Sequence, residues 1–130
     1  MHNRVTAFVS HCPIIDDEML ERLVMQASRP DSPITIVGSS GAIAPGPKRD
    51  SRLRAAIAGA QIVICLLGPI SRAVSDVGRE SHLAHDLAVP VLALMEDSGD
   101  GIDSSIYYDR WIVWTWDGLA RTVREVAAPA

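Results

Sequence analysis

The chain has 130 residues, of which 48% are hydrophobic and 22% are charged, and its net charge at pH 7 is −4. This length and this hydrophobic fraction allow one domain with a buried core, so we expect a single domain over residues 1–130. The net charge is weakly negative and no basic run is present, which excludes nucleic-acid binders and binders of anionic membranes. No stretch of about 18 consecutive apolar residues is present, which excludes a membrane-spanning helix. We therefore expect a cytoplasmic protein.

Five short apolar runs, rich in β-branched residues, predict five strands. They span residues 4–10, 34–38, 61–68, 89–95 and 110–116. The middle runs are continuously hydrophobic, which is typical of parallel strands covered on both faces. Cys65 lies inside the third run, where a free buried thiol is ordinary, and Cys12 is the second cysteine, so no disulfide framework is expected.

Apolar stripes at helical spacing fill the gaps between these runs. They predict helices that begin after Asp16 and Asp17, at Ser51, at Ser75 or Asp76 (ending near Leu87), and at Asp117. The inward stripes are Met19, Leu20, Leu23, Val24 and Ala27; Leu53, Ala56, Ile57 and Ala60; and Leu119, Val123 and Val126. Alternating strands and helices predict an α/β protein, a three-layer sandwich around a parallel sheet.

The predicted binding region lies at the carboxyl ends of the strands. Ligands of open α/β sheets bind where the strand order reverses, which for the order 2-1-3-4-5 is between strands one and three. The loop after strand one carries Ser10, His11 and Cys12, and the loop after strand three runs from Gly68 to Asp76. We expect these two loops to line the site.

A long stretch rich in Gly and Pro, residues 38–50, follows the second predicted strand. Loops of this length are usually functional or mobile. Pro47 separates the lysine from the second glycine, so this is no phosphate-binding P-loop, and we expect Lys48 and Arg49 to be solvated.

Glu80 is hard to explain as a surface residue. At about 100° per residue it shares the stripe of Ala84 and Leu87 that should face the sheet. In the first turn of its helix, the dipole favours the ionised carboxylate. An anion directed into a crevice can stabilise a sugar-ring cation; the structural alternative is a capping role or an ion pair with Arg72 or Arg79.

Three segments carry a family resemblance: VTAFVSHCPIIDDEMLERLV, SRLRAAIAGA and QIVICLLGPISRAVSDVGRESHLAHDLAVPVLALM. In this order they resemble Toll/interleukin-1 receptor (TIR)-like domains, particularly the bacterial Thoeris type, over nearly the whole chain. The resemblance implies a flavodoxin-like sandwich in which Glu80 cleaves the nicotinamide–ribose N-glycosidic bond of NAD. It implies that Ser10 and His11 lie beside the nucleotide and that the loop 39–49 serves assembly and closure. Thoeris-type relatives make cyclic ADP-ribose-type signals in antiphage defence.

The resemblance and the loop positions together provide the candidate site. Glu80 is the catalytic candidate, and the substrate-binding candidates are Ser10, His11, Cys12, Ser39, Gly68, Pro69, Ser71, Ser75 and Asp76. Asp76 stands where family members commonly carry Trp, and it does not offer the same apolar wall. No metal and no cofactor besides the substrate NAD are expected, because His82 and His85 lack compact ligand spacing with His11 and Cys12. The expected partners are NAD or a related nucleotide, and a second copy or another TIR-like protein.

Two further functions stay open. The first is a non-catalytic TIR-like interaction module. The second is a nucleoside or nucleotide N-glycosidase or deoxyribosyltransferase, because SDVGRESHLA resembles, more loosely, the Asp-rich turn and Glu of nucleoside 2-deoxyribosyltransferases.

The departing nicotinamide of NAD is already cationic and requires no general acid, so one carboxylate is chemically sufficient for its cleavage.

Overall fold

A computed structural model of the chain describes residues 4–12, 16–68, 75–97, 102 and 104–127. The elements alternate between strand and helix up to β4. They are β1 (Val5–Ser10), α1 (Asp17–Ala27), β2 (Ile34–Ser39), the 3₁₀ turn η1 (Ser40–Ala42), α2 (Arg49–Ala58), β3 (Ile62–Leu67), α3 (Ser75–Asp86), β4 (Val91–Met95), β5 (Arg110–Val113) and α4 (Trp116–Val126).

The sheet is parallel throughout, with the strand order β2-β1-β3-β4-β5, which confirms the predicted fold class. Every residue of β3 and β4 is buried, because these strands are covered on both faces, as their continuous hydrophobicity predicted. The chain turns from β2 back across β1 to β3, so the strand order reverses between β1 and β3. A crevice for a ligand is therefore expected at the carboxyl ends of these strands.

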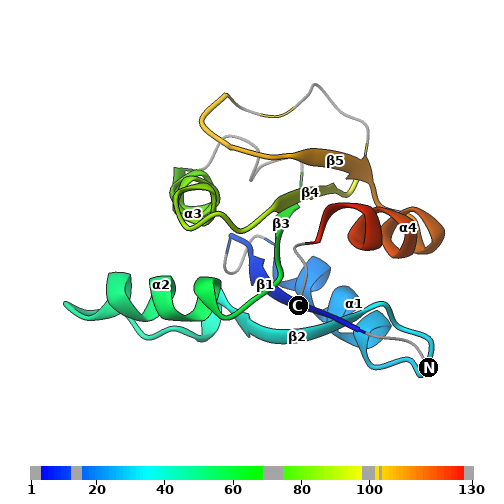
Figure 1. Cartoon of the computed structure of the whole chain (residues 1–130), viewed down its shortest axis with the longest axis horizontal. Coiled ribbons are helices and arrows are strands. Elements are labelled where there is room, and N and C mark those ends of the chain that lie inside the picture. The colour runs from blue at the N-terminus through cyan, green and yellow to red at the C-terminus, as the bar shows by residue number, and fades with distance from the viewer. Residues whose placement is uncertain (1–3, 13–15, 69–74, 98–101, 103, 128–130) are drawn as a thin grey trace.

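Helices α1 and α4 cover one face of the sheet, and α2 and α3 cover the other (Figure 1). Alternate residues of the strands point to opposite faces, so the core divides into two clusters. On the α1 and α4 side the buried residues include Met19, Leu23, Ile64, Leu66, Leu94, Leu119 and Val123. On the α2 and α3 side they include Phe8, Leu53, Ile57, Val63, Cys65, Val77 and Ala84. The second cluster supports the two helices that carry Arg49 and Glu80.

Two expectations for the first two helices were wrong. Val24 is 48% exposed, because α1 packs through a narrower stripe centred on Met19 and Leu23. Helix α2 begins at Arg49, ahead of Ser51, whose hydroxyl donates to the carbonyl of Lys48 at 3.0 Å from inside the first turn.

The cap of α4 is Thr115 and not Asp117. The Thr115 hydroxyl accepts a hydrogen bond from the amide of Gly118 at 3.0 Å, while Asp117 lies inside the first turn, where the helix dipole favours its charge. The fifth strand is also shorter than expected and ends at Val113. Within the described ranges, no helix has the length and apolar character that crossing a membrane requires.

Candidate functional site

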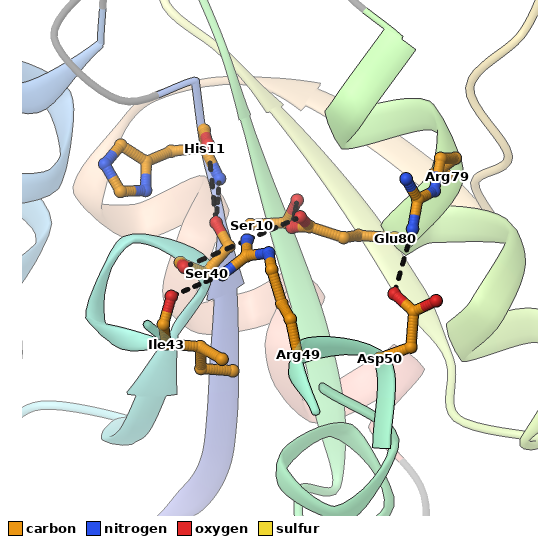
Figure 2. A network of polar contacts seen from close by, with 8 residues as sticks. All are labelled: Ser10, His11, Ser40, Ile43, Arg49, Asp50, Arg79 and Glu80. Atoms are coloured by element: carbon orange, nitrogen blue, oxygen red, sulfur yellow. Dashed lines mark hydrogen bonds and ion pairs between the residues drawn. The ribbon is translucent and has the colours of Figure 1, made fainter. Parts of the chain in front are cut away.

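Residues from four elements meet at the carboxyl ends of β1 and β2. Ser10 is the last residue of β1, and Ser40 follows the end of β2. Arg49 is the first residue of α2, and Glu80 lies in the second turn of α3. Figure 2 shows the side chains of these residues converging on the Glu80 carboxyl group.

Glu80 is 6% exposed, as its place on the inward stripe predicted. Its Oε1 accepts a hydrogen bond from the hydroxyl of Ser10 at 2.6 Å, and Ser10 is itself fully buried. Its Oε2 lies 3.8 Å from Nη2 of Arg49. The carboxyl group is therefore held in one position by a neutral donor on one oxygen and a cation near the other.

Arg49 is fixed in place and not solvated as the loop composition suggested. Its guanidinium donates to the main-chain carbonyls of Ile43 and Ser40, the latter at 3.3 Å, and its side chain is 30% exposed. These carbonyls converge because the segment after β2 turns back onto the start of α2 (Figure 2). The same turn directs the guanidinium toward Glu80.

Burial raises the pKa of Glu80 above its ordinary value of 4.5, and the negative charge of Asp76 acts in the same direction. Hydrogen bonds from Ser10 and Ser40, and the positive charge of Arg49, lower the pKa but do not cancel the effect of burial. The helix dipole led us to expect the opposite direction. The dipole acts mainly within the first turn, and Glu80 lies beyond it, in a helix that begins at Ser75.

A cavity of about 610 Å³ lies between α2 and α3, with Glu80 in its wall. Its charged lining consists of Arg49, Asp50, Arg54, Asp76, Arg79, Glu80 and Asp86. Arg79 pairs with Asp50 at 3.0 Å across the gap between the two helices. The alternative that Arg79 forms an ion pair with Glu80 is therefore wrong, because Arg79 pairs with Asp50. Arg72, the other arginine considered for this pair, lies outside the described residues.

Ser10 and Asp76 are the predicted binding residues that the structure brings to Glu80, Ser10 by direct contact and Asp76 as an exposed residue of the same cavity. His11 is 3% exposed, and its ring points away from Glu80, with Nε2 at 3.2 Å from Asp17 Oδ1 (Figure 2). Its amide donates to the hydroxyl of Ser40 at 3.2 Å. His11 therefore contacts this site through its main chain.

Four more of the predicted binding residues fall within the described ranges. Cys12 is buried just beyond β1, and Ser39 is half-buried at the end of β2. Gly68 approaches Asp16 so closely that a Cβ there would lie 2.5 Å from Oδ1. Ser75 is the first residue of α3. Pro69 and Ser71 lie outside the described residues.

The two cysteines are unsuited to nucleophilic chemistry. Burial, with the nearby charge of Glu80, raises the pKa of Cys65 to about 12. Burial and the carboxylates of Asp16, Asp76 and Asp17 raise the pKa of Cys12. A thiolate is the reactive form, so both side chains remain thiols at neutral pH.

Ser40 and Arg49 were missed as site residues. Nothing in the sequence distinguishes Ser40 from Ser39 beside it. Arg49 had one available signal, its place just ahead of a predicted helix, but its approach to Glu80 depends on how that helix packs against α3.

Across the described residues, no group of three or more His, Cys, Asp or Glu side chains is arranged to hold a metal ion. Comparisons of the chain with protein-family models and with curated proteins found no match. The function is therefore argued from the chemistry of Glu80, Ser10, Arg49 and the cavity beside them.

Proposed function

We propose that this chain is an enzyme that cleaves the nicotinamide–ribose N-glycosidic bond of NAD, with Glu80 as its catalytic carboxylate. The observation that supports this most is a buried, doubly held carboxyl group in the wall of a cavity at the strand ends. The volume of about 610 Å³ falls in the range of about 300–1,000 Å³ typical of small-molecule sites.

The chemistry requires one bond to break and one to form. When the bond between ribose C1 and the pyridinium nitrogen breaks, its electron pair goes to that nitrogen, and neutral nicotinamide leaves. The positive charge passes to the ribose ring, and the Glu80 carboxylate stabilises it. Water then adds to C1 and loses a proton to solvent, which yields ADP-ribose. A nucleophile of the same nucleotide in place of water yields a cyclic product.

The raised pKa of Glu80 supports this role. Burial destabilises the ionised carboxylate of Glu80, and Ser10 and Arg49 compensate in part. A positive charge that develops beside the carboxylate in the transition state interacts strongly in a site shielded from water. Such an interaction is stronger in the transition state than in the ground state, which is the condition for catalysis.

The test is the release of nicotinamide from NAD by the purified protein, measured by chromatography over a range of protein concentrations. We expect Glu80→Gln to reduce the rate by at least about 100-fold, the usual effect of removing one electrostatic stabiliser. Glu21→Gln, on the exposed face of α1, is the matched control and should leave the rate unchanged. Absence of release at every concentration, or equal release by Glu80→Gln, would contradict the proposal.

A nucleoside or nucleotide N-glycosidase is the second candidate. It is favoured by Asp76, which places a second carboxylate in the cavity of Glu80, where it can accept hydrogen bonds from sugar hydroxyls. Offering nucleosides, deoxynucleosides and nucleotides in the same assay, and identifying the released base, separates the two candidates.

The partners of the proposed enzyme are NAD or a related nucleotide, and a second copy of this chain or another TIR-like protein. We place the activity in the cytoplasm, where NAD is available. If the chain is an interaction module, Glu80→Gln leaves its association unchanged, and substitution of Pro45 or Pro47 abolishes it.

A further inference from the structure

We infer that the cavity between α2 and α3 recognises phosphate groups through Arg54 and Arg79, and that its ligand is a nucleotide rather than a bare nucleoside. This inference rests on the proposed function in one respect: the bond that the enzyme cleaves is taken from it. Phosphate binding itself is measured without any cleavage, so the two proposals fail separately.

Three guanidinium groups line this one cavity, and they differ in how firmly they are held. Arg49 is committed to the carbonyls of Ser40 and Ile43 and to Glu80. Its donors serve the catalytic carboxyl group and the loop after β2. Arg49 is therefore not the residue we assign to phosphate.

Among the described residues, Asp50 is the partner of Arg79, through a contact of 3.0 Å across the cavity. The two side chains are 69% and 76% exposed, and an exposed ion pair of this kind contributes little to stability. A phosphate group accepts two parallel hydrogen bonds from a guanidinium, which is a stronger interaction than the exposed pair. A phosphate ligand can thus displace Asp50 from Arg79 at little energetic cost.

Arg54 is the available cation of the cavity. It lies on α2, one turn after Asp50, and its side chain is exposed. Among the residues that the structure describes, its guanidinium has no hydrogen bond or ion pair. All of its donors are therefore free to bind an incoming anion, as arginine does at many phosphate sites.

The acidic lining narrows the ligand class further. Asp76 and Asp86 line the same cavity as the arginines, so a highly charged anion without other groups would be repelled there. Carboxylates accept hydrogen bonds from hydroxyl groups. A cavity with both kinds of group suits a ligand that carries phosphates and sugar hydroxyls together, as a nucleotide does.

The experiment is a calorimetric titration of the purified chain with ADP-ribose, which carries the diphosphate but no scissile nicotinamide bond, and with adenosine, which has no phosphate. We expect ADP-ribose to bind, and Arg54→Gln and Arg79→Gln each to weaken its binding by about tenfold. The affinity for adenosine should be the same for the wild type and for the arginine variants. Arg52→Gln, an exposed arginine of α2 outside the cavity lining, is the matched control.

Nicotinamide riboside, which lacks phosphate, provides the second measurement. If NAD is cleaved, both arginine variants should lose kcat/KM for NAD by about tenfold and keep it for nicotinamide riboside. No binding of ADP-ribose, or binding that the double variant leaves unchanged, overturns the phosphate assignment. Arginine-dependent binding of ADP-ribose without nicotinamide release upholds the assignment and overturns the proposed cleavage.

Discussion

Glu80 combines a cost of burial with the chemistry that we propose for its carboxyl group. Its carboxyl group is buried, accepts one short hydrogen bond from Ser10 and faces one cation, Arg49. Buried carboxylates are stable when paired and hydrogen-bonded, and here the pairing at 3.8 Å is loose. The net effect is a pKa above the ordinary value.

At the residue scale, the pH dependence of cleavage should follow Glu80. The proposed mechanism requires the ionised carboxylate, so kcat/KM for NAD should fall as the pH drops through the raised pKa of Glu80. Arg49→Gln removes a charge that lowers this pKa and should move the acid limb to higher pH. Asp76→Asn removes a charge that raises it and should move the acid limb to lower pH. Shifts of both variants in the same direction would contradict the assignment.

Stability should depend on Glu80 with a sign opposite to that of a salt-bridged carboxylate. A folded-state pKa raised above the unfolded value means that the folded state binds the proton more tightly, so stability declines as the pH rises through the two values. Glu80→Gln lacks this decline. The free energy of unfolding of Glu80→Gln, from urea titration, should therefore rise relative to that of the wild type as the pH increases from acid to neutral. For Glu21→Gln, at an exposed position, the difference from the wild type should stay constant over this pH range.

At the element scale, the C-terminus of α3 retains an avoidable strain. Ala88 follows this helix with φ of 59°, the left-handed region that disfavours a side chain. The amide of Val89 donates to the carbonyl of Ala84 at 2.9 Å, and that of Ala88 to His85 at 3.0 Å, which closes the helix end. Glycine is the usual residue at such a position.

Ala88→Gly should therefore stabilise the protein. The gain from removing the strain exceeds the extra entropy that glycine loses on folding, and we expect roughly 0.5–1 kcal/mol from thermal or urea unfolding. Ala55→Gly, an exposed position inside α2, is the control and should destabilise by about 0.5–1 kcal/mol. Equal effects of the two changes would contradict the helix-end geometry.

The helices show what local signals predict well and where they fail. The stripes of α1 and α4 predicted the buried residues Met19, Leu23, Leu119 and Val123. Helix starts were less accurate. Ser51 and Asp117 are residue types that favour caps, but the chain entered each helix earlier, because the preceding segments were placed by their packing and hydrogen bonds.

At the scale of the whole molecule, stability should be greatest in the central strands. β3 and β4 are buried along their entire length and paired on both sides, whereas β2 and β5 are edge strands with exposed residues. We expect amide hydrogen exchange, followed by mass spectrometry, to be slowest in β3 and β4 and fastest among the strands in β5. Protection of β5 equal to that of β3 would indicate that a partner covers this edge.

By itself, the sequence determined the α/β class and the parallel sheet, because these follow from hydrophobic periods and from the alternation of strands and helices. The strand order was expected from the family resemblance, and the structure confirms it. It also determined that Glu80 faces the sheet, since one helix stripe decides that direction.

Only the tertiary structure decided what meets Glu80. Its contact with Ser10 joins residues 70 positions apart, and its approach to Arg49 depends on the turn after β2 and on the packing of α2 against α3. Local periodicity carries no information on such distances. The direction of the pKa of Glu80 likewise follows from burial by many distant neighbours, which outweighs the local dipole of its own helix.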